Sequence, residues 1–412
     1  MTNDVGILIR NARLRGNPGA LTDIAIAGGV FAEIGQLSDC KARIEIDAGG
    51  NLVTPSYVNP HLHLCKVWTR PMMSEAAMGA YHGDGMKHAS SAIELASKVK
   101  ESYHASWIVK NARRAVALAA LHGTLHIRTF ADVDSKARLE GVKALLEVRD
   151  EFRGIVDVQV VAFAQDGIQR DPGTDGLMRD AMALGADVVG GIPWIEHSDA
   201  DAQAHVAFCF DLAREFGKDV SMLLDDAGDA SLRTLEMMAN EAIKRSFEGR
   251  ALAHHCRAMS LYPEPYLREL AGTLRRARVS VVSDPHTGPL HAQVRELLAE
   301  AVNVCLGQDD ISDAYYPYGR NNMLEVAFLA SHLLWMMSRQ DMETLYDMIT
   351  VAGAKAMNIG NFGIAQGQPA HLVVLDQPDV VEALRFHGAP RAVISHGRLV
   401  DLPKMREMAG IV

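Results

Sequence analysis

Cysteine is scarce in this chain, and the few cysteines are scattered. The 412 residues include five cysteines. They are Cys40, Cys65, Cys209, Cys256 and Cys305, and no two of them form a CxxC pair. An odd, scattered set suits a reducing cytoplasm better than a disulfide framework. We therefore expect a cytoplasmic protein.

An excess of basic residues is also lacking. Lys and Arg number 41 against 51 Asp and Glu, which gives a formal net charge of −10. Proteins that bind nucleic acids neutralise phosphates with Lys and Arg, and no basic stripe stands out in this sequence. We therefore expect no nucleic-acid partner.

Long hydrophobic runs are missing as well. The most apolar stretch, residues 323–337, contains Glu325, Ser331 and His332 and is shorter than the ~20 residues that span a bilayer. The first residues, MTNDVGILIRNARL, lack the basic and apolar segments of a signal peptide. We expect a soluble protein with no membrane partner, in which residues 323–337 form a buried helix or a helix of a subunit contact.

Both ends of the chain show the residue pattern of short β-strands. Near the N-terminus, DIAIAGGVFAEIG places Gly28-Gly29 where a two-residue hairpin turn belongs. Near the C-terminus, AHLVVLD and RAVISHGRLVD repeat this pattern, with a turn at His396-Gly397. The pattern predicts a small β-sandwich built from residues 1–56 and 359–412; the alternative is two unrelated β appendages.

The middle of the chain, residues 57–358, has a different rhythm. Near-continuous apolar runs such as LHIRTFADV, VDVQVVAFA and DVSMLLDDA are each followed by a helical pattern, for example near residues 135–152. Such alternation is typical of a parallel sheet covered by helices. We count eight such strands, and no GxGxxG follows any of them, so we predict a (β/α)8 TIM-type barrel rather than an open dinucleotide-binding sheet.

The first strand of this predicted barrel ends in a pair of histidines. Residues 52–66 read LVTPSYVNPHLHLCK, and side chains two residues apart on a strand point to the same face. His61 and His63 could therefore hold one metal ion together, although a bare HxH is by itself a weak signal. The active site of such a barrel lies at the carboxyl ends of its strands. Polar residues follow most of the other strands, among them Gln165, Asp225 and Asp226, His255, and Asp309 and Asp310.

Several long stretches resemble the amidohydrolase superfamily. These are VNPHLHL, LHIRTFADVDS, DVQVVAFAQDGI, LGADVVGGIP, GQDDISDAYYPYG and GIAQGQPAHLVVLD. The resemblance runs over nearly the whole chain and is closest to the branch of bacterial cytosine deaminases and N-isopropylammelide amidohydrolases. It implies a homo-oligomeric, metal-dependent hydrolase that acts on carbon–nitrogen bonds other than peptide bonds.

The resemblance also implies roles for individual residues. His61 and His63 match metal ligands on the first strand, and Asp309 matches an aspartate that touches the metal and takes a proton from the attacking water. His255 matches a histidine that orients this water or polarises the scissile group. The matched metal is a single divalent ion, with zinc as the first candidate and iron or manganese as alternatives.

Other matched positions belong to the substrate pocket. Gln165 aligns with a glutamine that hydrogen-bonds the substrate ring, and Asp310 and Tyr315 align with an aspartate and an aromatic residue that line the pocket. In the deaminases this aromatic residue is a tryptophan. Asp226 aligns with a glutamate that passes protons to the ring, and an N-cap of the next helix is an equally good interpretation of Asp226.

One departure from the family pattern changes the expected chemistry. Where the deaminases have HCDE after the fifth strand, this chain has Leu223-Leu224-Asp225-Asp226, and Phe130 replaces another histidine. Leucine cannot coordinate a metal, so His255 or Asp225 could complete the ligand set, or the site could stay empty. The aspartate at 226 is also one methylene shorter than the family's glutamate.

Two functions follow from these residues. The first is hydrolysis of a C–N bond in a small nitrogen heterocycle or cyclic amide, with a substrate more apolar or more substituted than cytosine. The second is a catalytically weakened, metal-poor barrel that binds a small molecule or serves in an assembly. Residues 70–85, which are rich in Gly and Met, could form a lid over the pocket, and Cys65 and Cys256 could act as sulfur ligands.

Overall fold

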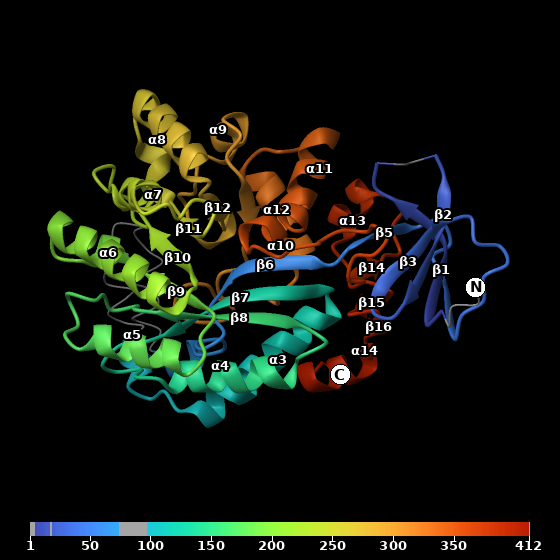
Figure 1. The fold of residues 1–412 in the computed structure, drawn as a ribbon, viewed down its shortest axis with the longest axis horizontal. Coiled ribbons are helices and arrows are strands. Elements are labelled where there is room, and N and C mark those ends of the chain that lie inside the picture. Colours follow the sequence, from blue (N-terminus) through green and yellow to red (C-terminus); the bar gives the residue numbers. More distant parts are fainter. Residues whose placement is uncertain (1–4, 17–18, 74–96, 412) are drawn as a thin grey trace.

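The protein has two sheets, each with its own hydrophobic core (Figure 1). The computed structural model describes residues 5–16, 19–73 and 97–411. One sheet belongs to a central barrel surrounded by helices, and the other combines strands from both ends of the chain. The lid predicted at residues 70–85 lies largely outside the described residues.

The predicted barrel is present, with eight parallel strands in the order of the sequence. They are β6 (Tyr57–Leu62), β7 (Thr124–Asp132), β8 (Asp157–Phe163), β9 (Val188–Gly191), β10 (Asp219–Leu224), β11 (Ala251–His255), β12 (Ser280–Ser283) and β13 (Val304–Leu306). A parallel bridge between Leu62 and Asp309 brings the first strand beside the segment that follows the last. The His63 N–H donates to the Asp309 carbonyl at 3.0 Å, and the Asp309 N–H donates to the His61 carbonyl at 2.9 Å.

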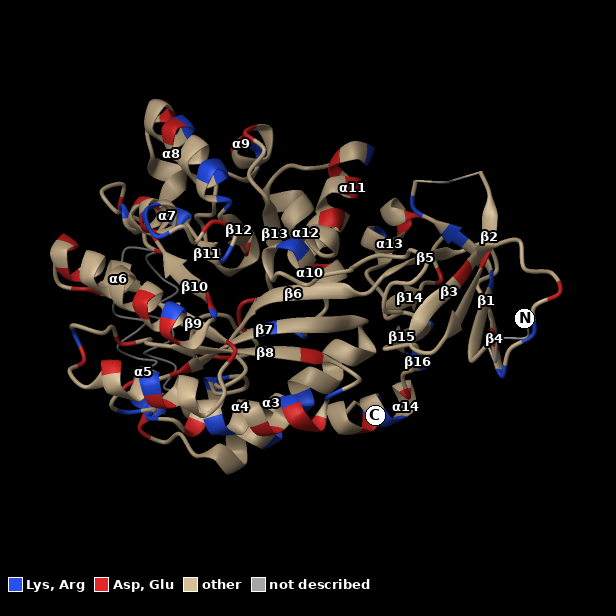
Figure 2. Ribbon diagram, viewed as in Figure 1, with Lys and Arg blue, Asp and Glu red and all other residues tan. Residues whose placement is uncertain are grey.

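The apolar runs become strands because they can be buried on both faces. Every residue of β6, β7, β9 and β11 is buried, as expected for parallel strands packed inside a ring of helices. The surrounding helices are α3 (Ala105–Leu121), α4 (Glu140–Glu151), α5 (Thr174–Ala183), α6 (Asp199–Phe216), α7 (Thr234–Lys244), α8 (Glu264–Ala277), α9 (Val294–Ala299), α10 (Met323–Leu333), α11 (Arg339–Met348) and α12 (Val351–Ala356). Figure 2 shows acidic and basic residues mixed over these outer helices.

Helix α8 illustrates how the sequence pattern sets the packing. Its buried residues are Leu267, Leu270, Ala271, Leu274 and Ala277, a spacing of three and four that places them on one helical face. The helix ends where Arg278 adopts a left-handed conformation with φ of 50°. The charged residues that remain face solvent.

The two ends of the chain form one mixed sheet of eight strands. They are β1 (Ile7–Leu14), β2 (Leu21–Ala27), β3 (Val30–Gly35), β4 (Ile44–Asp47), β5 (Leu52–Pro55), β14 (Leu372–Val374), β15 (Ala392–Ser395) and β16 (Arg398–Leu399). Strand β14 pairs antiparallel with β5, with Val373 opposite Thr54, so the alternative of two unrelated appendages is wrong. Both predicted hairpin turns are present, with positive φ at Gly28 and Gly29 and at His396 and Gly397.

The terminal sheet and the barrel meet at several contacts. The last helix, α14 (Leu402–Ala409), returns to the barrel, where the Arg114 side chain of α3 donates to the Ala409 carbonyl at 2.8 Å. At another contact, the ring of His126 on β7 lies 4.9 Å from the ring of His371, next to β14. Burial lowers the pKa of His126 to about 4 and that of His371 to about 3.

In the described part of the chain, no helix has both the length and the apolar character needed to cross a membrane.

Candidate functional site

Three side chains meet at the closing seam of the barrel. His61 lies on β6, His63 follows this strand, and Asp309 follows β13; all three are buried. The Asp309 carboxylate lies 2.9 Å from His61 Nε2 and 3.8 Å from His63 Nε2. One ligand atom from each residue fits within 4.8 Å of the others. The three residues are therefore close enough to hold one cation.

The backbone around this seam leaves little room for other residues. A Cβ atom on Gly307 would lie 2.6 Å from the Cβ of His61, so the close approach of the two segments requires glycine. Asp309 itself has a φ of 67°, a conformation that non-glycine residues adopt rarely and that is often found at functional sites. This uncommon backbone conformation places the Asp309 carboxylate beside the two histidines.

The three side chains fit a divalent cation by their chemistry as well. His61 Nδ1 lies 2.6 Å from His254 Nδ1, and the other nitrogen of His254 lies 2.6 Å from the Ser221 hydroxyl. Nε2 of His61 is buried and faces the Asp309 carboxylate at 2.9 Å. Burial also lowers the pKa of His61, and that of His63 further, which keeps both imidazoles neutral. Two neutral imidazoles and one carboxylate form a common catalytic metal set.

The fifth strand contributes an apolar wall instead of a ligand. Leu223 on β10 lines the cavity and packs in a cluster with Phe130, Val161, Phe163, Val188, Ile192, Ile195 and Trp194. The Phe130 ring lies 4.8 Å from the His61 ring and 5.2 Å from the His63 ring. The two departures from the family pattern therefore meet beside the histidines, where they make this side of the cavity apolar.

The two aspartates after β10 point to different places. Asp225 accepts hydrogen bonds from the Thr234 N–H and hydroxyl at 2.7 Å and from the Tyr262 hydroxyl at 2.7 Å, at the start of α7. Asp226 lines the cavity instead. Asp225 is therefore committed to the following helix, and Asp226 is the carboxylate that can act on a bound molecule.

A network of charged side chains surrounds His255 on the same side of the cavity. Its Nδ1 lies 2.9 Å from Asp284, and its Nε2 lies 3.8 Å from Asp226. Burial alone lowers the pKa of His255, but these two carboxylates raise it more, to about 9. Arg257 donates to Asp226 at 2.5 Å and to Asp284 at 2.8 Å. At neutral pH His255 is therefore a protonated, hydrogen-bonding cation.

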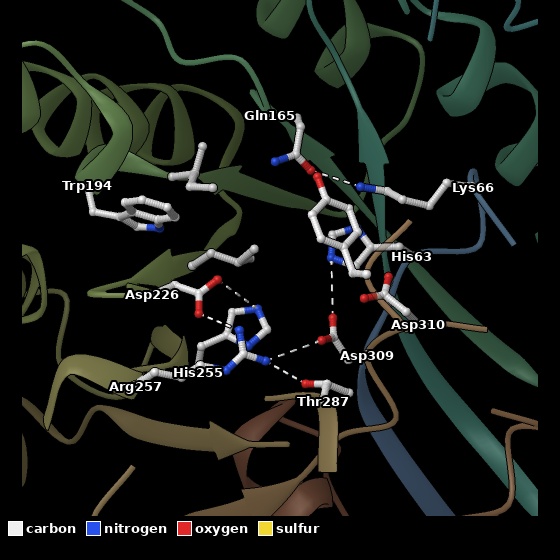
Figure 3. A pocket seen from close by; sticks show the side chains of 13 residues that line it. His63, Lys66, Gln165, Trp194, Asp226, His255, Arg257, Thr287, Asp309 and Asp310 are labelled. Carbon is white, nitrogen blue, oxygen red and sulfur yellow. Dashed lines mark hydrogen bonds and ion pairs between the residues drawn. The ribbon is translucent and has the colours of Figure 1, made fainter. Parts of the chain in front are cut away.

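Another part of the cavity wall, formed by Lys66, Gln165 and Asp310, carries further hydrogen-bonding groups (Figure 3). Gln165 accepts a hydrogen bond from Lys66 Nζ at 2.8 Å, which leaves the amide N–H2 of Gln165 as a donor. The Lys66 ammonium lies 5.3 Å from the centre of the Tyr315 ring. Burial, together with the neighbouring charges of Asp309 and Asp313, raises the pKa of Asp310 well above its usual value. A protonated Asp310 can donate as well as accept a hydrogen bond.

One cavity collects nearly all the residues expected from the sequence. Its walls are His63, Lys66, Gln165, Ile192, Trp194, Leu223, Asp226, His255, Arg257, Thr287, Asp309, Asp310 and Tyr315, and it encloses about 480 Å³, counting space open to solvent. Of the predicted residues, only His61 lies behind the wall.

Sequence reasoning missed five residues of this cavity, namely Lys66, Ile192, Trp194, Arg257 and Thr287. Position could have suggested two of them, since Lys66 is three residues after His63 and Arg257 is two after His255. The thiols of Cys65 and Cys256 face backbone carbonyls at 3.5 and 3.6 Å, and neither belongs to the group of candidate metal ligands.

Comparisons with known proteins agree with this architecture. The model of the amidohydrolase family matches residues 45–401. The N-isopropylammelide isopropyl amidohydrolase of Pseudomonas sp. (strain ADP) is 30% identical, over 97% of this chain and 98% of the relative. The crystal structure of 5-methylcytosine deaminase from Klebsiella pneumoniae superposes with a TM-score of 0.87 at 31% identity, over 95% of this chain and 97% of that one. The structure of N-isopropylammelide isopropylaminohydrolase from Burkholderia multivorans superposes with a TM-score of 0.84 at 25% identity, over 96% and 97%. The chain therefore belongs to the amidohydrolase family, and is a hydrolase of carbon–nitrogen bonds.

Proposed function

We propose that this chain is a metal-dependent hydrolase that cleaves a C–N bond of a small nitrogen heterocycle or cyclic amide. The observation that carries the proposal is a single cavity in which a metal-ligand set faces a buried acid–base pair. His63 and Asp309 form one side, and His255 and Asp226 form the other. Hydrolysis of an amidine-like or amide bond needs both elements, an activated water and a proton donor for the leaving nitrogen.

His61, His63 and Asp309 would hold one divalent cation, with zinc as the first candidate and iron or manganese as alternatives. Such a cation lowers the pKa of a bound water and so supplies a nucleophile near neutral pH. Leu223 offers no nitrogen, so this ligand set depends on its histidines remaining neutral, and their burial supports that.

The remaining residues would move protons and stabilise charge. Asp309 would take a proton from the attacking water, because its carboxylate faces the cavity beside the histidines. His255, protonated at neutral pH, would donate a hydrogen bond to the oxyanion or to the polarised ring nitrogen. Asp226 would pass the proton to the leaving nitrogen; burial raises its pKa, which favours a carboxyl that can carry a proton.

The cavity walls suggest the kind of substrate. Gln165 and Asp310 would hydrogen-bond one polar edge of a planar ring, with Tyr315 beside it. Leu223 and Trp194 form an apolar wall that would accommodate an alkyl group. Two relatives are named for substrates with an alkyl group: a 5-methylcytosine deaminase and an N-isopropylammelide isopropyl amidohydrolase. We propose an alkyl-substituted or N-alkylated aminopyrimidine or triazine, in preference to cytosine, and release of ammonia or an alkylamine.

The test combines metal content with a substrate screen. Purified protein, its His61→Ala variant and a His197→Ala control on an exposed position are compared by inductively coupled plasma mass spectrometry. We expect the metal at the seam to be absent only from His61→Ala. Aminopyrimidines, triazines and cyclic amides, each with and without an alkyl group, are then screened for ammonia or amine release. Turnover of none of them, by protein shown to carry this metal, would contradict the proposed substrate class.

No observation favours the alternative of a catalytically weakened barrel, because the carboxylates and histidines that hydrolysis needs lie together in the cavity. We also propose, from the family resemblance, that the chain forms a homo-oligomer in the cytoplasm. The boundaries of the two units, at residues 57 and 358, are likewise proposed.

A further inference from the structure

A second cluster of possible metal ligands lies where the barrel meets the terminal sheet. His126 belongs to β7 and Asp157 begins β8, both in the barrel. His371 directly precedes β14, and His396 lies in the turn between β15 and β16, both in the terminal sheet. Asp157 is at the opposite end of β8 from Gln165, and this strand alone spans about 20 Å at ~3.3 Å per residue, so the cluster is well separated from the cavity.

The distances within this cluster resemble those of a metal site. His126 Nδ1 lies 3.4 Å from one Asp157 oxygen, and His396 Nε2 lies 3.1 Å from the other. Ligand atoms of His126, Asp157 and His371 all fall within 4.8 Å of one another. Two ligands that are each about 2.0–2.1 Å from a tetrahedral zinc ion are about 3.3 Å apart. His126, Asp157 and His371 would therefore need only small adjustments to reach one ion. His396, which contacts Asp157, would have to move closer to the other two histidines to join them.

The available nitrogen atoms agree with this arrangement. His126 is 4% exposed, and its Nδ1 is the nitrogen that faces Asp157. Its other nitrogen, Nε2, is buried with no hydrogen-bond partner among the residues that the structure describes. Nδ1 of His371 faces the N–H of His396 at 3.5 Å and the Ser395 hydroxyl at 3.4 Å, which leaves its Nε2 for an ion. Protein interiors rarely leave buried polar atoms unpaired without a reason.

The position of each residue explains how an ion could enter and what it would do. The side chains of Asp157 and His396 are 43% and 40% exposed, so the cluster is open to solvent on one side. His126 and His371 close the other side, with ring centres 4.9 Å apart. Each unit contributes two of the four ligands, so a bound ion would cross-link the barrel to the terminal sheet.

We propose that His126, Asp157, His371 and His396 form a second, structural zinc site that clamps the terminal sheet to the barrel. Three imidazoles and one carboxylate complete a tetrahedral shell with no open position, which is typical of structural rather than catalytic zinc. The site is independent of the proposed catalytic metal, since the two share no ligand.

Zinc stoichiometry separates the two sites. The whole chain is stripped with a chelator, reloaded with zinc, desalted and analysed by mass spectrometry, as wild type, His61→Ala, His396→Gln and the double variant. We expect two, one, one and no zinc per chain. His396 lies in a turn with a partly exposed side chain, so we expect the fold to tolerate its substitution. His197→Gln serves as the matched surface control and should keep two zinc ions per chain.

The local structure of the second zinc gives an independent measurement. X-ray absorption of zinc-loaded His61→Ala should show four nitrogen or oxygen ligands at about 2.0–2.1 Å with imidazole scattering. Chelation should lower the melting temperature of His61→Ala and leave that of the double variant unchanged. The proposal is overturned if His61→Ala binds no zinc, or if His396→Gln keeps as much zinc as wild type. If only the proposed catalytic metal were wrong, wild type and His61→Ala would each bind one zinc, and His396→Gln none.

Discussion

At the scale of single residues, the cavity is defined as much by what Leu223 lacks as by what its neighbours provide. Leu223 is 4% exposed and packs against Phe130, beside the histidines proposed as metal ligands. A histidine in its place would add a nitrogen donor to the set formed by His61, His63 and Asp309. Leucine instead makes the wall apolar. In the proposed function, the residue at position 223 would therefore affect both metal affinity and the fit of an alkyl-substituted substrate, in opposite directions.

A Leu223→His substitution tests this balance. We expect slower loss of metal to a competing chelator, together with a loss of stability of about 1–3 kcal/mol from placing a polar ring in an apolar cluster. Activity on alkyl-substituted substrates should fall relative to unsubstituted ones. Leu224→His is the control, because Leu224 belongs to the helix-facing core; it should destabilise the protein without changing metal retention.

The pH dependence of stability should report the charge on His255. Burial opposes its protonation, but Asp226 and Asp284 raise its pKa from 6.5 to about 9. A pKa raised on folding adds stability that is complete below pH 6.5 and is lost as the pH rises through 9, on the order of 3 kcal/mol. Urea unfolding of the metal-free protein between pH 6 and 9 should show this decline.

His255→Gln is the matched variant for that experiment. The amide can keep one hydrogen bond to Asp284 but cannot titrate, so the decline between pH 6.5 and 9 should flatten. Asp284 is the partner of His255 in this interaction. Its own lowered pKa reports the same interaction and adds no further stability to the folded state. An unchanged slope in the variant would mean that other groups cause the decline.

At the scale of elements, the strand ends carry the unusual backbone of the site. Asp225, His255 and Asp309 each follow or end a barrel strand, and all three have positive φ. Gly307 is needed at the last strand because a Cβ there would lie 2.6 Å from that of His61. The position of the histidine thus depends on a residue that has no side chain.

Gly307→Ala should therefore disturb the proposed metal site through the backbone. We expect a loss of about 1–3 kcal/mol in stability and weaker metal retention, because the methyl group displaces His61. Gly272→Ala is the control, since Gly272 lies in α8 with no atom near its added Cβ. Alanine in a helix should raise stability there by up to about 1 kcal/mol. Denaturant unfolding and chelator competition measure both variants.

The sequence predicted the elements better than their limits. The strand expected over residues 125–133 is β7, Thr124–Asp132, but the helix expected near residues 135–152 begins only at Glu140. Asp134 explains the delay, since its carboxylate accepts hydrogen bonds from the N–H groups of Lys136 and Ala137 and holds a turn. Periodicity identifies the buried face of a helix. It does not show where a side chain such as Asp134 will accept hydrogen bonds from backbone N–H groups and so delay the start of the helix.

The functional site was also predicted only in part. The HxH spacing and the positions of the strand ends predicted that His63, His255 and Asp309 lie near one another, because the barrel topology brings the ends of its strands together. The sequence did not predict that Arg257 and Trp194 line the cavity, because this depends on the direction in which each loop turns after its strand. The difference between Asp225, bound to α7, and Asp226, facing the cavity, is likewise a matter of backbone conformation that neighbouring identical residues do not reveal.

At the scale of the whole molecule, the C-terminal segment belongs to two cores. Strands β14 to β16 complete the terminal sheet, whereas α14 packs on α3 and buries Met405 in the core of the barrel. Met405→Ala should cost about 2–5 kcal/mol, as expected for a large side chain removed from a core. Lys404→Ala, on the exposed side of the same helix, should change stability by less than about 0.5 kcal/mol. Thermal unfolding distinguishes these outcomes, and equal effects would show that α14 is only loosely attached.

The bridge between Leu62 and Asp309 has a consequence for how the enzyme matures. It joins segments separated by most of the chain, and the same seam carries His61, His63 and Asp309. A nascent chain therefore has no intact binding site until its last barrel strand has been synthesised and has docked against the first. A metal ion bound at this seam, as proposed, would therefore report that the barrel has closed, and a chain that ends before residue 309 would lack the carboxylate of the proposed ligand set.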